Sequence, residues 1–229
     1  MNKIGWIIFS TVVVLLLGGL IAWTRISNPP IDVSGVENNS VIAASNQNGN
    51  IADHTTGSDT NKLLLIEYGD YQCPSCGAVF PHLQTLIEDY GDKFTFIFRN
   101  FPLTSIHPNA RSAASAAEAA GLQGKFWEMH DALYTKQNDW SSLDATKRTN
   151  TFKGYAQTLG IDVAQFEADM ASKPVTQKVN FDIAVGTSVS VDATPTFFLN
   201  GKKVDDATSS AMVNGDLTAI KAKIDELNK

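Results

Sequence analysis

The sequence predicts an α/β protein with an inserted helical subdomain, preceded by one transmembrane helix. Segments of strand character alternate with segments of helical period, and a long helical stretch interrupts this alternation. An uncharged apolar segment near the N-terminus predicts the membrane helix. The 229 residues are 43% hydrophobic and 18% charged, which excludes both wholesale disorder and a polytopic membrane protein.

The charge pattern excludes a nucleic-acid-binding protein. The chain has 18 Lys and Arg residues against 24 Asp and Glu residues, and its net charge is −6. No basic segment is longer than two residues, so a phosphate backbone would find no basic patch on which to bind. We therefore expect no nucleic acid among the partners of this protein.

Residues 4–23 form the uncharged segment, and as a helix it would be about 30 Å long, the hydrocarbon thickness of a bilayer. A cleaved signal peptide is the alternative, but its apolar core is usually about 7 to 15 residues long, and no small-residue cleavage site follows Trp23. We therefore expect an uncleaved, single-pass membrane anchor over residues 1–26. Lys3 and Arg25 lie on opposite sides of the segment, so the flanking charges predict its orientation only weakly.

The next segment, residues 27–52, contains Pro29 and Pro30, many Asn and Ser residues and no apolar period. This composition predicts a flexible tether whose r.m.s. reach is on the order of 28 Å. Residues 53–229 show no internal repeat and no low-complexity tract. We expect them to form one soluble domain close to the membrane.

The beginning of this domain predicts a βαβ unit. Residues 63–68 (LLLIEY) are apolar except for one carboxylate, which is the pattern of a central strand covered on both faces. Residues 74–90 then follow a helical period and end before Gly91. Residues 94–99 (FTFIFR) predict the second strand.

The middle of the domain predicts an inserted helical subdomain over about residues 105–173. It contains four helical segments, at residues 110–120, 126–136, 151–159 and 162–171. In the last of these, Asp162 and Gln165 form a capping pair.

The end of the domain predicts a helix, a hairpin and a further helix. The first helix follows Pro174 and extends to about residue 186. Asn200-Gly201 separates two short strands and is a strong signal for a type I′ hairpin. Apolar residues from Val213 to Leu227 recur at helical spacing and predict one final amphipathic helix.

The two cysteines of the chain, Cys73 and Cys76, stand three positions apart at the predicted start of a helix. A pair at this spacing can form a disulfide, and the unpaired N–H groups and dipole of the helix favour negative charge on the first sulfur. We expect Cys73 to be the reactive thiolate and Cys76, about one turn further, to be the more buried resolving thiol. Pro74 and Ser75 offer no cationic partner between them, so the sequence leaves the redox potential open.

The cysteine pair has three alternative interpretations. A structural disulfide across so short a loop would stabilise the fold only weakly. A zinc site would need two more nitrogen or sulfur ligands, and the four histidines lack the paired spacing of such a site, so we expect no metal. Inert buried cysteines would need neither the short spacing nor a helix start. Redox activity accounts for the pattern best.

The order of several motifs along the chain resembles that of a known family. The strand, the Cys73-Pro74-Ser75-Cys76 motif, Pro81 beyond it, the helical insert and the segment Ala193-Thr194-Pro195-Thr196 occur in an order that resembles the DsbA-like branch of the thioredoxin superfamily. The resemblance covers about residues 53–229. It implies a thioredoxin fold and thiol–disulfide oxidoreductase activity that needs no cofactor.

The resemblance also implies roles for three residues outside the cysteine motif. Pro195 would be in the cis form and face the cysteines, and Thr194 would offer its backbone to an extended substrate peptide. A trans proline at a strand start is the alternative. Glu67 would be the buried acid that helps to protonate and deprotonate Cys76, and burial would raise the pKa of its carboxyl group. A solvated acid at a strand end is the alternative.

Several neighbouring residues receive simpler interpretations. Asp70 is expected to be exposed, although it lies nearer the cysteine motif than Glu67 does. His107 and Asn109 belong to a stretch that recurs in the family, and we interpret it as an N-cap. Three large side chains are expected in the core of the insert: Phe126, Trp127 and Met129.

These observations predict a membrane-anchored disulfide oxidase on the extracytoplasmic side, which donates disulfides to newly exported proteins. By analogy, a membrane quinone reductase would reoxidise it. A reductase or isomerase, which uses the same chemistry in the other direction, is an alternative. An isomerase usually needs a dimerisation module, and residues 27–62 show none, so we expect a monomer. A non-catalytic peptide-binding module is a further alternative, against which the two intact cysteines and Glu67 argue.

Overall fold

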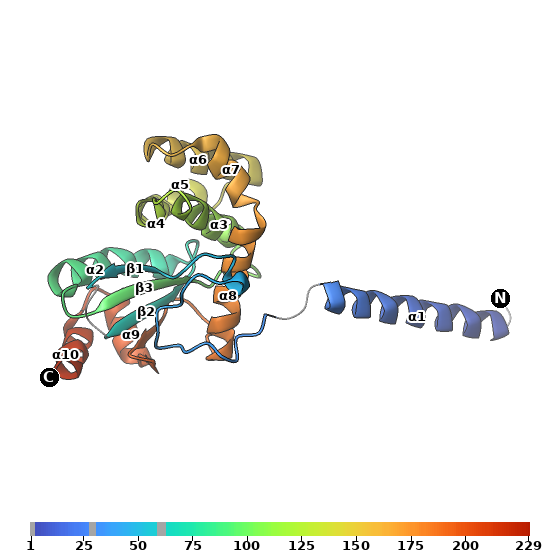
Figure 1. Cartoon of the computed structure of the whole chain (residues 1–229), viewed down its shortest axis with the longest axis horizontal. Coiled ribbons are helices and arrows are strands. Elements are labelled where there is room, and N and C mark those ends of the chain that lie inside the picture. The colour runs from blue at the N-terminus through green and yellow to red at the C-terminus, as the bar shows by residue number, and fades with distance from the viewer. Residues whose placement is uncertain (1–2, 28–30, 59–62) are drawn as a thin grey trace. The chain divides into compact units, whose positions relative to one another are not determined.

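The computed structural model describes residues 3–27, 31–58 and 63–229. The chain divides into two compact units, Met1–Asp32 and Val33–Lys229. The first unit contains helix α1 (Lys3–Ser27), and the second contains all the other elements (Figure 1). Within α1, Lys3–Leu20 has a mean hydropathy of 2.0, and α1 is the one helix among the described residues that is long and apolar enough to cross a membrane. The expected N-terminal apolar helix is therefore present.

The second unit is built on a five-stranded mixed sheet of order β1-β3-β2-β4-β5. β2 and β3 are parallel, and the other three neighbouring pairs are antiparallel. The expected α/β class and thioredoxin fold are confirmed. The strands are β1 (His54–Gly57), β2 (Leu64–Gly69), β3 (Thr95–Asn100), β4 (Thr196–Leu199) and β5 (Lys202–Lys203).

The centre of the sheet is the expected βαβ unit, in which helix α2 (Pro74–Tyr90) connects β2 to β3. All six residues of β2 and all six of β3 are buried, as their continuous apolar character requires. Successive strand residues point to opposite faces of a sheet. Leu65, but not Leu64 or Ile66, belongs to the core cluster that contains the inner face of α2. Glu67, two residues after Leu65, therefore projects toward α2.

Helices between β3 and β4 form the expected insert and the helix that follows it (Figure 1). In α7 the Asp162 side chain accepts a hydrogen bond from the Gln165 N–H at 2.9 Å, so the expected cap is confirmed. Phe126 and Met129 are buried in the core, whereas Trp127 is half-buried. The helices are α3 (Ala110–Gly121), α4 (Phe126–Thr135), α5 (Gln137–Trp140), α6 (Ala145–Thr158), α7 (Val163–Met170) and α8 (Lys173–Ser188).

In the C-terminal part, the predicted hairpin is present, but the predicted last helix is divided in two. β4 and β5 are joined by Asn200 and Gly201, whose φ angles are 48° and 77°, as a type I′ turn requires. The prediction of a single helix between residues 213 and 227 is wrong. Two helices, α9 (Asp206–Val213) and α10 (Thr218–Leu227), are separated by a turn in which Gly215 has a φ of 87°.

Residues 33–52 belong to the folded unit. The expectation of a flexible tether over residues 27–52 is therefore wrong for this part of the segment. A short 3-10 helix, η1 (Asn46–Asn48), lies in this segment, and Asn48 is fully buried. Ile42 and Asp53 hold the segment together, because the Ile42 N–H donates to the Asp53 carboxylate at 2.9 Å and the Asp53 N–H donates to the Ile42 carbonyl at 2.9 Å. The domain thus begins near residue 33 instead of residue 53. Pro29 and Pro30 lie outside the described residues.

Candidate active site

The two cysteines lie where α2 begins. Cys73 is the N-cap residue of this helix, with φ of −69° and ψ of 125°, and its carbonyl accepts a hydrogen bond from the Gly77 N–H at 3.1 Å. The residue is 7% exposed, whereas Cys76, one turn further, is completely buried. Both side chains are free thiols. The structure therefore brings together one thiol that keeps a small exposed fraction and one that has none.

Thr194 and Pro195 lie directly opposite the first thiol. The Thr194–Pro195 peptide bond is cis, the geometry that the family resemblance implies. The Cys73 thiol donates a hydrogen bond to the Thr194 carbonyl, with an Sγ to O distance of 3.3 Å. Residues 121 positions apart in the chain thus meet at one point. The contact orients the thiol, because a carbonyl oxygen can only accept a hydrogen bond.

The surroundings of Cys73 favour its thiolate. A hydrogen bond from the Cys76 thiol is the main cause that lowers the pKa of Cys73, to about 5. Burial opposes this effect, and the N–H groups of Cys76 and Ser75 add to the stabilisation of the thiolate. The backbone groups belong to the first turn of α2, where the N–H groups have no partner within the helix.

The pKa values of Cys76 and Glu67 are raised, in contrast to that of Cys73. Burial raises the pKa of the Cys76 thiol well above its ordinary value, and its hydrogen bond to Cys73 adds to the increase. Burial also raises the pKa of the Glu67 carboxyl group to about 8, and the negative charge on Cys73 contributes. Glu67 is 2% exposed, so the alternative of a solvated acid is excluded. Its Oε1 atom has no hydrogen-bond partner in the described structure.

Gly69 makes room for this carboxyl group. A Cβ atom at this position would lie 3.1 Å from Glu67 Oε1 and 2.3 Å from an edge carbon of the Phe98 ring. The second distance is too short for any real contact. A glycine is therefore required where β2 ends, so that Phe98 can pack beside the acid.

Asp70 is 1% exposed, so the expectation that it faces solvent is wrong. Its carboxylate accepts hydrogen bonds from the N–H groups of Gln72 at 2.7 Å and Leu103 at 2.9 Å, and lies 2.8 Å from His107 Nδ1. Its own carbonyl accepts from the Cys73 N–H at 3.0 Å. Asp70 therefore fixes the turn that carries the reactive cysteine.

Asn109 differs from the sequence interpretation as well. It occupies the N-cap position of α3, but its side chain makes no capping hydrogen bond. Instead its amide donates to the carbonyls of Ser141 at 3.0 Å and Leu143 at 2.9 Å. Its backbone N–H donates to the Gln72 side chain at 2.6 Å. Asn109 and Gln72 thus connect the loop before Cys73 to the insert.

The sequence did not single out two glutamines that hold the site. The Gln72 amide donates to Ser141 O at 2.7 Å, and the Gln137 amide donates to the carbonyls of Tyr71 at 2.8 Å and Cys73 at 2.9 Å. Neither glutamine belongs to a motif or follows a period. Their contacts become visible only when the insert is folded against the cysteine loop.

The family can now be assigned. A family model described as thioredoxin matches residues 49–217. The chain belongs to the thioredoxin family. Among the described residues of this thioredoxin-family protein, no group of three or more His, Cys, Asp or Glu side chains is placed to hold a metal ion.

Solved structures place the domain beside the DsbA-family thiol–disulfide oxidoreductases. Oxidised BdbD from Bacillus subtilis is 25% identical, with a TM-score of 0.63, and the match covers 83% of this chain and 99% of that one. The thiol-disulfide exchange protein alpha-DsbA2 from Wolbachia pipientis is 21% identical, also with a TM-score of 0.63, over 76% of this chain and 87% of that one. The fold is that of the DsbA-like oxidoreductases.

The curated relatives of this chain are named as sodium/proton antiporters. A protein of Salinispora arenicola named Na(+)/H(+) antiporter NhaA 1 is 38% identical over 151 residues, which are 66% of this chain and 22% of that protein. The corresponding protein of Mycolicibacterium gilvum is 39% identical over 153 residues, 66% of this chain and 24% of that protein. The chain thus spans less than a quarter of the length of these relatives.

Proposed function

We propose that this protein is a membrane-anchored disulfide oxidase that donates the Cys73–Cys76 disulfide to exported proteins. The supporting observation is the position of Cys73, whose sulfur lies at the start of α2, among N–H groups of its first turn and at the edge of solvent. The thiolate is the form of cysteine that takes part in thiol–disulfide exchange. A site that stabilises the Cys73 thiolate is a site for this exchange.

The reaction consists of two exchanges. A substrate thiolate attacks Cys73 Sγ of the oxidised protein, a substrate–Cys73 disulfide forms, and Cys76 leaves as a thiolate that takes up a proton. The second substrate thiolate then attacks the substrate sulfur of the mixed disulfide, and Cys73 leaves as a thiolate. Two electrons pass from the substrate to the protein, the substrate gains one disulfide, and the protein becomes a dithiol.

The lowered pKa of Cys73 supports this direction. It lies about two units below pH 7, so ionisation stabilises the reduced protein at that pH. After allowance for screening at the solvent-facing sulfur, the effect is about 2 kcal/mol, or about 40 mV in favour of oxidising substrates. A poor leaving group at Cys73 would instead favour retention of the disulfide.

Glu67 is proposed to exchange the proton of Cys76. The carboxyl group projects from β2 toward α2, and the negative charge of Glu67 contributes to the raised pKa of Cys76. Because burial raises the pKa of Glu67 to about 8, the acid is largely protonated at neutral pH and can protonate Cys76 as this thiolate leaves. In the reverse reaction, the same carboxylate accepts the proton.

Thr194 and Pro195 are proposed to bind the substrate backbone. They border a hollow of about 320 Å³ that also contains Ser75 and hydroxyl groups of α9. An extended peptide can lie in this hollow beside the sulfur and use the Thr194 backbone as a short edge strand would. Thr194 lines this hollow and its carbonyl contacts the Cys73 sulfur, so a peptide bound there would pass close to the reactive residue.

The apolar helix α1 supports a proposed location at a membrane surface. α1 would hold the domain at the membrane, and disulfides form and persist outside the reducing cytosol, so we place the domain on the extracytoplasmic side. Reoxidation then requires an electron acceptor, and we propose a membrane quinone reductase by analogy with the family. Antiport is not transferred from the names of the curated relatives, because the chain spans less than a quarter of their length.

Substitution of the resolving thiol tests whether Cys73 exchanges disulfides with exported proteins. Cys76→Ala is expected to accumulate mixed disulfides between Cys73 and exported proteins, visible on non-reducing gels and lost after reduction. The control Cys73→Ala/Cys76→Ala retains no thiol and should trap nothing. The full chain should also oxidise a reduced dithiol peptide faster than glutathione disulfide alone does.

The redox potential separates the proposal from its alternatives. A midpoint near the −120 mV of DsbA supports an oxidase, whereas one near the −270 mV of thioredoxin would mean a reductase. If the protein neither oxidises dithiol peptides nor reduces insulin above the uncatalysed rate, the peptide-binding alternative replaces both. Each of these outcomes assigns a different function to the same fold.

A further inference from the structure

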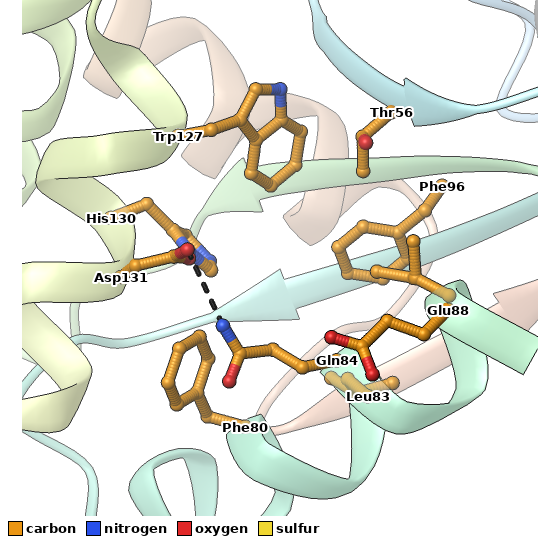
Figure 2. Close-up of a pocket in the computed structure, with 10 residues that line it drawn as sticks. Thr56, Phe80, Leu83, Gln84, Glu88, Phe96, Trp127, His130 and Asp131 are labelled. Carbon is orange, nitrogen blue, oxygen red and sulfur yellow. Dashed lines mark hydrogen bonds and ion pairs between the residues drawn. The ribbon is translucent and has the colours of Figure 1, made fainter.

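A second pocket lies away from the cysteines, between α2 and α4 (Figure 2). Its volume is about 190 Å³. Residues of α2 between Phe80 and Glu88 form one wall, residues of α4 form the other, and Thr56 of β1 and Phe96 of β3 close the inner end. None of the residues proposed to act in thiol exchange lines it. The pocket is therefore a separate feature of the domain.

Aromatic rings surround the open space. Figure 2 shows Trp127, Phe96 and Phe80 around it, with the six-membered ring of the indole pointing toward its centre. The centroids of Phe96 and Trp127 are 5.9 Å apart, and those of Phe80 and His130 are 5.7 Å apart. The Trp127 indole N–H donates to the Thr55 carbonyl at 3.0 Å, which holds this ring in place. Aromatic rings from α2, α4 and β3 thus line the pocket, and one of them is fixed by a hydrogen bond.

The charges at the pocket are negative. Asp131 and Glu88 line it, from α4 and α2, and no Lys or Arg is found among the described residues of the lining. Asp131 is anchored, because its carboxylate accepts from the Gln84 amide at 3.3 Å and lies 3.0 Å from His130 Nδ1 (Figure 2). Burial lowers the pKa of His130, so the imidazole is neutral at pH 7 and does not neutralise the carboxylate.

This combination has a defined chemical preference. The face of an aromatic ring attracts a cation, and several rings around one space recognise substituted ammonium groups. Carboxylates at the rim add an attraction of the same sign. The volume is smaller than the roughly 300 to 1,000 Å³ of a pocket for a drug-sized ligand, and suits one ammonium group with its carbon substituents.

We propose that this pocket binds an alkylammonium group, held between Trp127, Phe96 and Phe80 and neutralised by Asp131 and Glu88. Two sources carry this group: the quaternary trimethylammonium of a choline compound and the primary ammonium of a lysine side chain. The proposal does not depend on the redox function, because it concerns a different face of α2. Loss of thiol exchange in a cysteine variant would leave it unchanged.

Calorimetric titration of the full chain in an uncharged maltoside detergent tests the proposal with three probes. Choline and Nα-acetyl-lysine amide represent the two sources, and 3,3-dimethylbutan-1-ol has the shape of choline without its charge. At least one cation should bind about tenfold more tightly than the neutral alcohol. Binding of choline alone assigns a quaternary ammonium ligand, and binding of the lysine derivative alone assigns a lysine side chain. Equal binding of the alcohol, or no binding of either cation, would overturn the proposal.

Charge variants locate the bound cation. Glu88→Gln/Asp131→Asn should weaken cation binding about tenfold. The matched control Asp89→Asn/Glu128→Gln removes the same charge from the same two helices, at residues that do not line the pocket, and should change binding less than twofold. Glu88→Gln alone tests the rim without altering the contacts of Asp131, and should give a partial loss. Equal effects of the pocket and control pairs would show that only net charge matters and would contradict the assignment.

Discussion

At the scale of single residues, one helix start gives two thiols opposite properties. Cys73 lies among the unpaired N–H groups of the first turn of α2, whereas Cys76 is enclosed between α2 and the sheet. The first environment stabilises a negative charge and the second penalises it. A substrate can therefore reach the better leaving group, whereas the sulfur that it cannot reach is the one for which we propose Glu67 as the proton donor.

The pKa of Cys73 predicts how the redox potential changes with pH. Below about pH 5, reduction of the disulfide takes up two protons with two electrons, so the potential falls by about 59 mV per pH unit. Above that pH the reduced protein keeps Cys73 as a thiolate and takes up one proton, so the slope falls to about 30 mV per unit. Potentials measured against glutathione between pH 4 and pH 7 should show this break near pH 5.

The absence of a change in slope near pH 5 would contradict the assignment of Cys73 as a thiolate at neutral pH. A constant slope of about 59 mV per unit up to pH 8 would mean that Cys73 has an ordinary pKa. Absorbance of the thiolate at 240 nm, compared between the wild type and Cys76→Ala, gives an independent value. Because the Cys76 thiol is the main hydrogen-bond donor to Cys73, its removal should raise the pKa of Cys73.

Burial of the Glu67 carboxyl group is expected to lower the free energy of unfolding at neutral and higher pH. In the folded protein the carboxyl group holds its proton to about pH 8, whereas in the unfolded chain it loses the proton near pH 4.5. Folding therefore takes up a proton between these values, and the free energy of unfolding falls as pH rises through this window. Glu67→Gln removes the effect and should stabilise the reduced protein by about 4 kcal/mol at pH 8, and by less than about 1 kcal/mol at pH 5.

Urea unfolding of both proteins at the two pH values measures this difference. The same substitution should slow the protonation of Cys76, so rapid-mixing experiments should show slower exchange in the more stable variant. An equal effect on stability at pH 5 and pH 8 would mean that the carboxyl group does not titrate in this window. An unchanged exchange rate would remove Glu67 from the mechanism.

At the scale of elements, the sequence predicted those that have a continuous apolar or periodic signal. β2, α2 and β3 were predicted within one residue of their observed bounds, because each packs an apolar surface on a common core. β1 has the sequence HTTG and no apolar alternation, so its strand character comes only from pairing with β3. The break between α9 and α10 was missed because Val213 and Leu217 both pack against the core, although the helix does not continue between them.

The candidate site was predictable where its residues belong to a local motif. Cys73, Cys76 and Pro195 were found in this way, and their roles remain predictions. Asp70 was placed in solvent, because no local feature indicates that Leu103 and His107, more than thirty positions away, would supply its partners. Side-chain hydrogen bonds between distant loops leave no period in a sequence. The same reason explains why residues 33–52 resembled a tether.

A buried charge cluster attaches that N-terminal segment to the sheet. Burial opposes ionisation of Asp53, but Lys178 and Arg99 outweigh this and hold its pKa below the ordinary value. The Asp53 carboxylate lies 2.7 Å from Arg99 and 3.2 Å from Lys178, and all three side chains are fully buried. Asp53→Ala should lower the free energy of unfolding by about 3 to 5 kcal/mol, because it leaves two buried cations without their shared partner.

A surface ion pair provides the comparison for this prediction. Lys153 and Glu167 lie 2.7 Å apart, but both are partly exposed, so Glu167→Gln should change stability by less than about 1 kcal/mol. Hydrogen exchange should also become faster in residues 40–53 of Asp53→Ala than in β2. If Asp53→Ala is no more destabilising than Glu167→Gln, the segment is not held by this cluster.

At the scale of the whole molecule, one apolar helix precedes a folded unit that begins at Val33. The segment from residue 33 to β1 is held by Arg99, which also donates to the Ser40 carbonyl at 2.9 Å. The residues that follow Val33 are therefore part of the folded domain and are held against it by hydrogen bonds.

The side of the membrane on which Cys73 lies can be determined in intact cells. The full chain should stay in the membrane fraction after carbonate extraction, because α1 supplies an apolar segment of membrane-spanning length. After reduction, a maleimide that cannot cross the membrane should label Cys73 in whole cells, since the proposed site faces outward. Cys73→Ser should lose this label, because Cys76 is completely buried. Labelling only after lysis would place the domain in the cytosol and remove the oxidase proposal. Release of the protein by carbonate, with a mass shortened by the N-terminal segment, would instead identify residues 4–23 as a cleaved signal peptide.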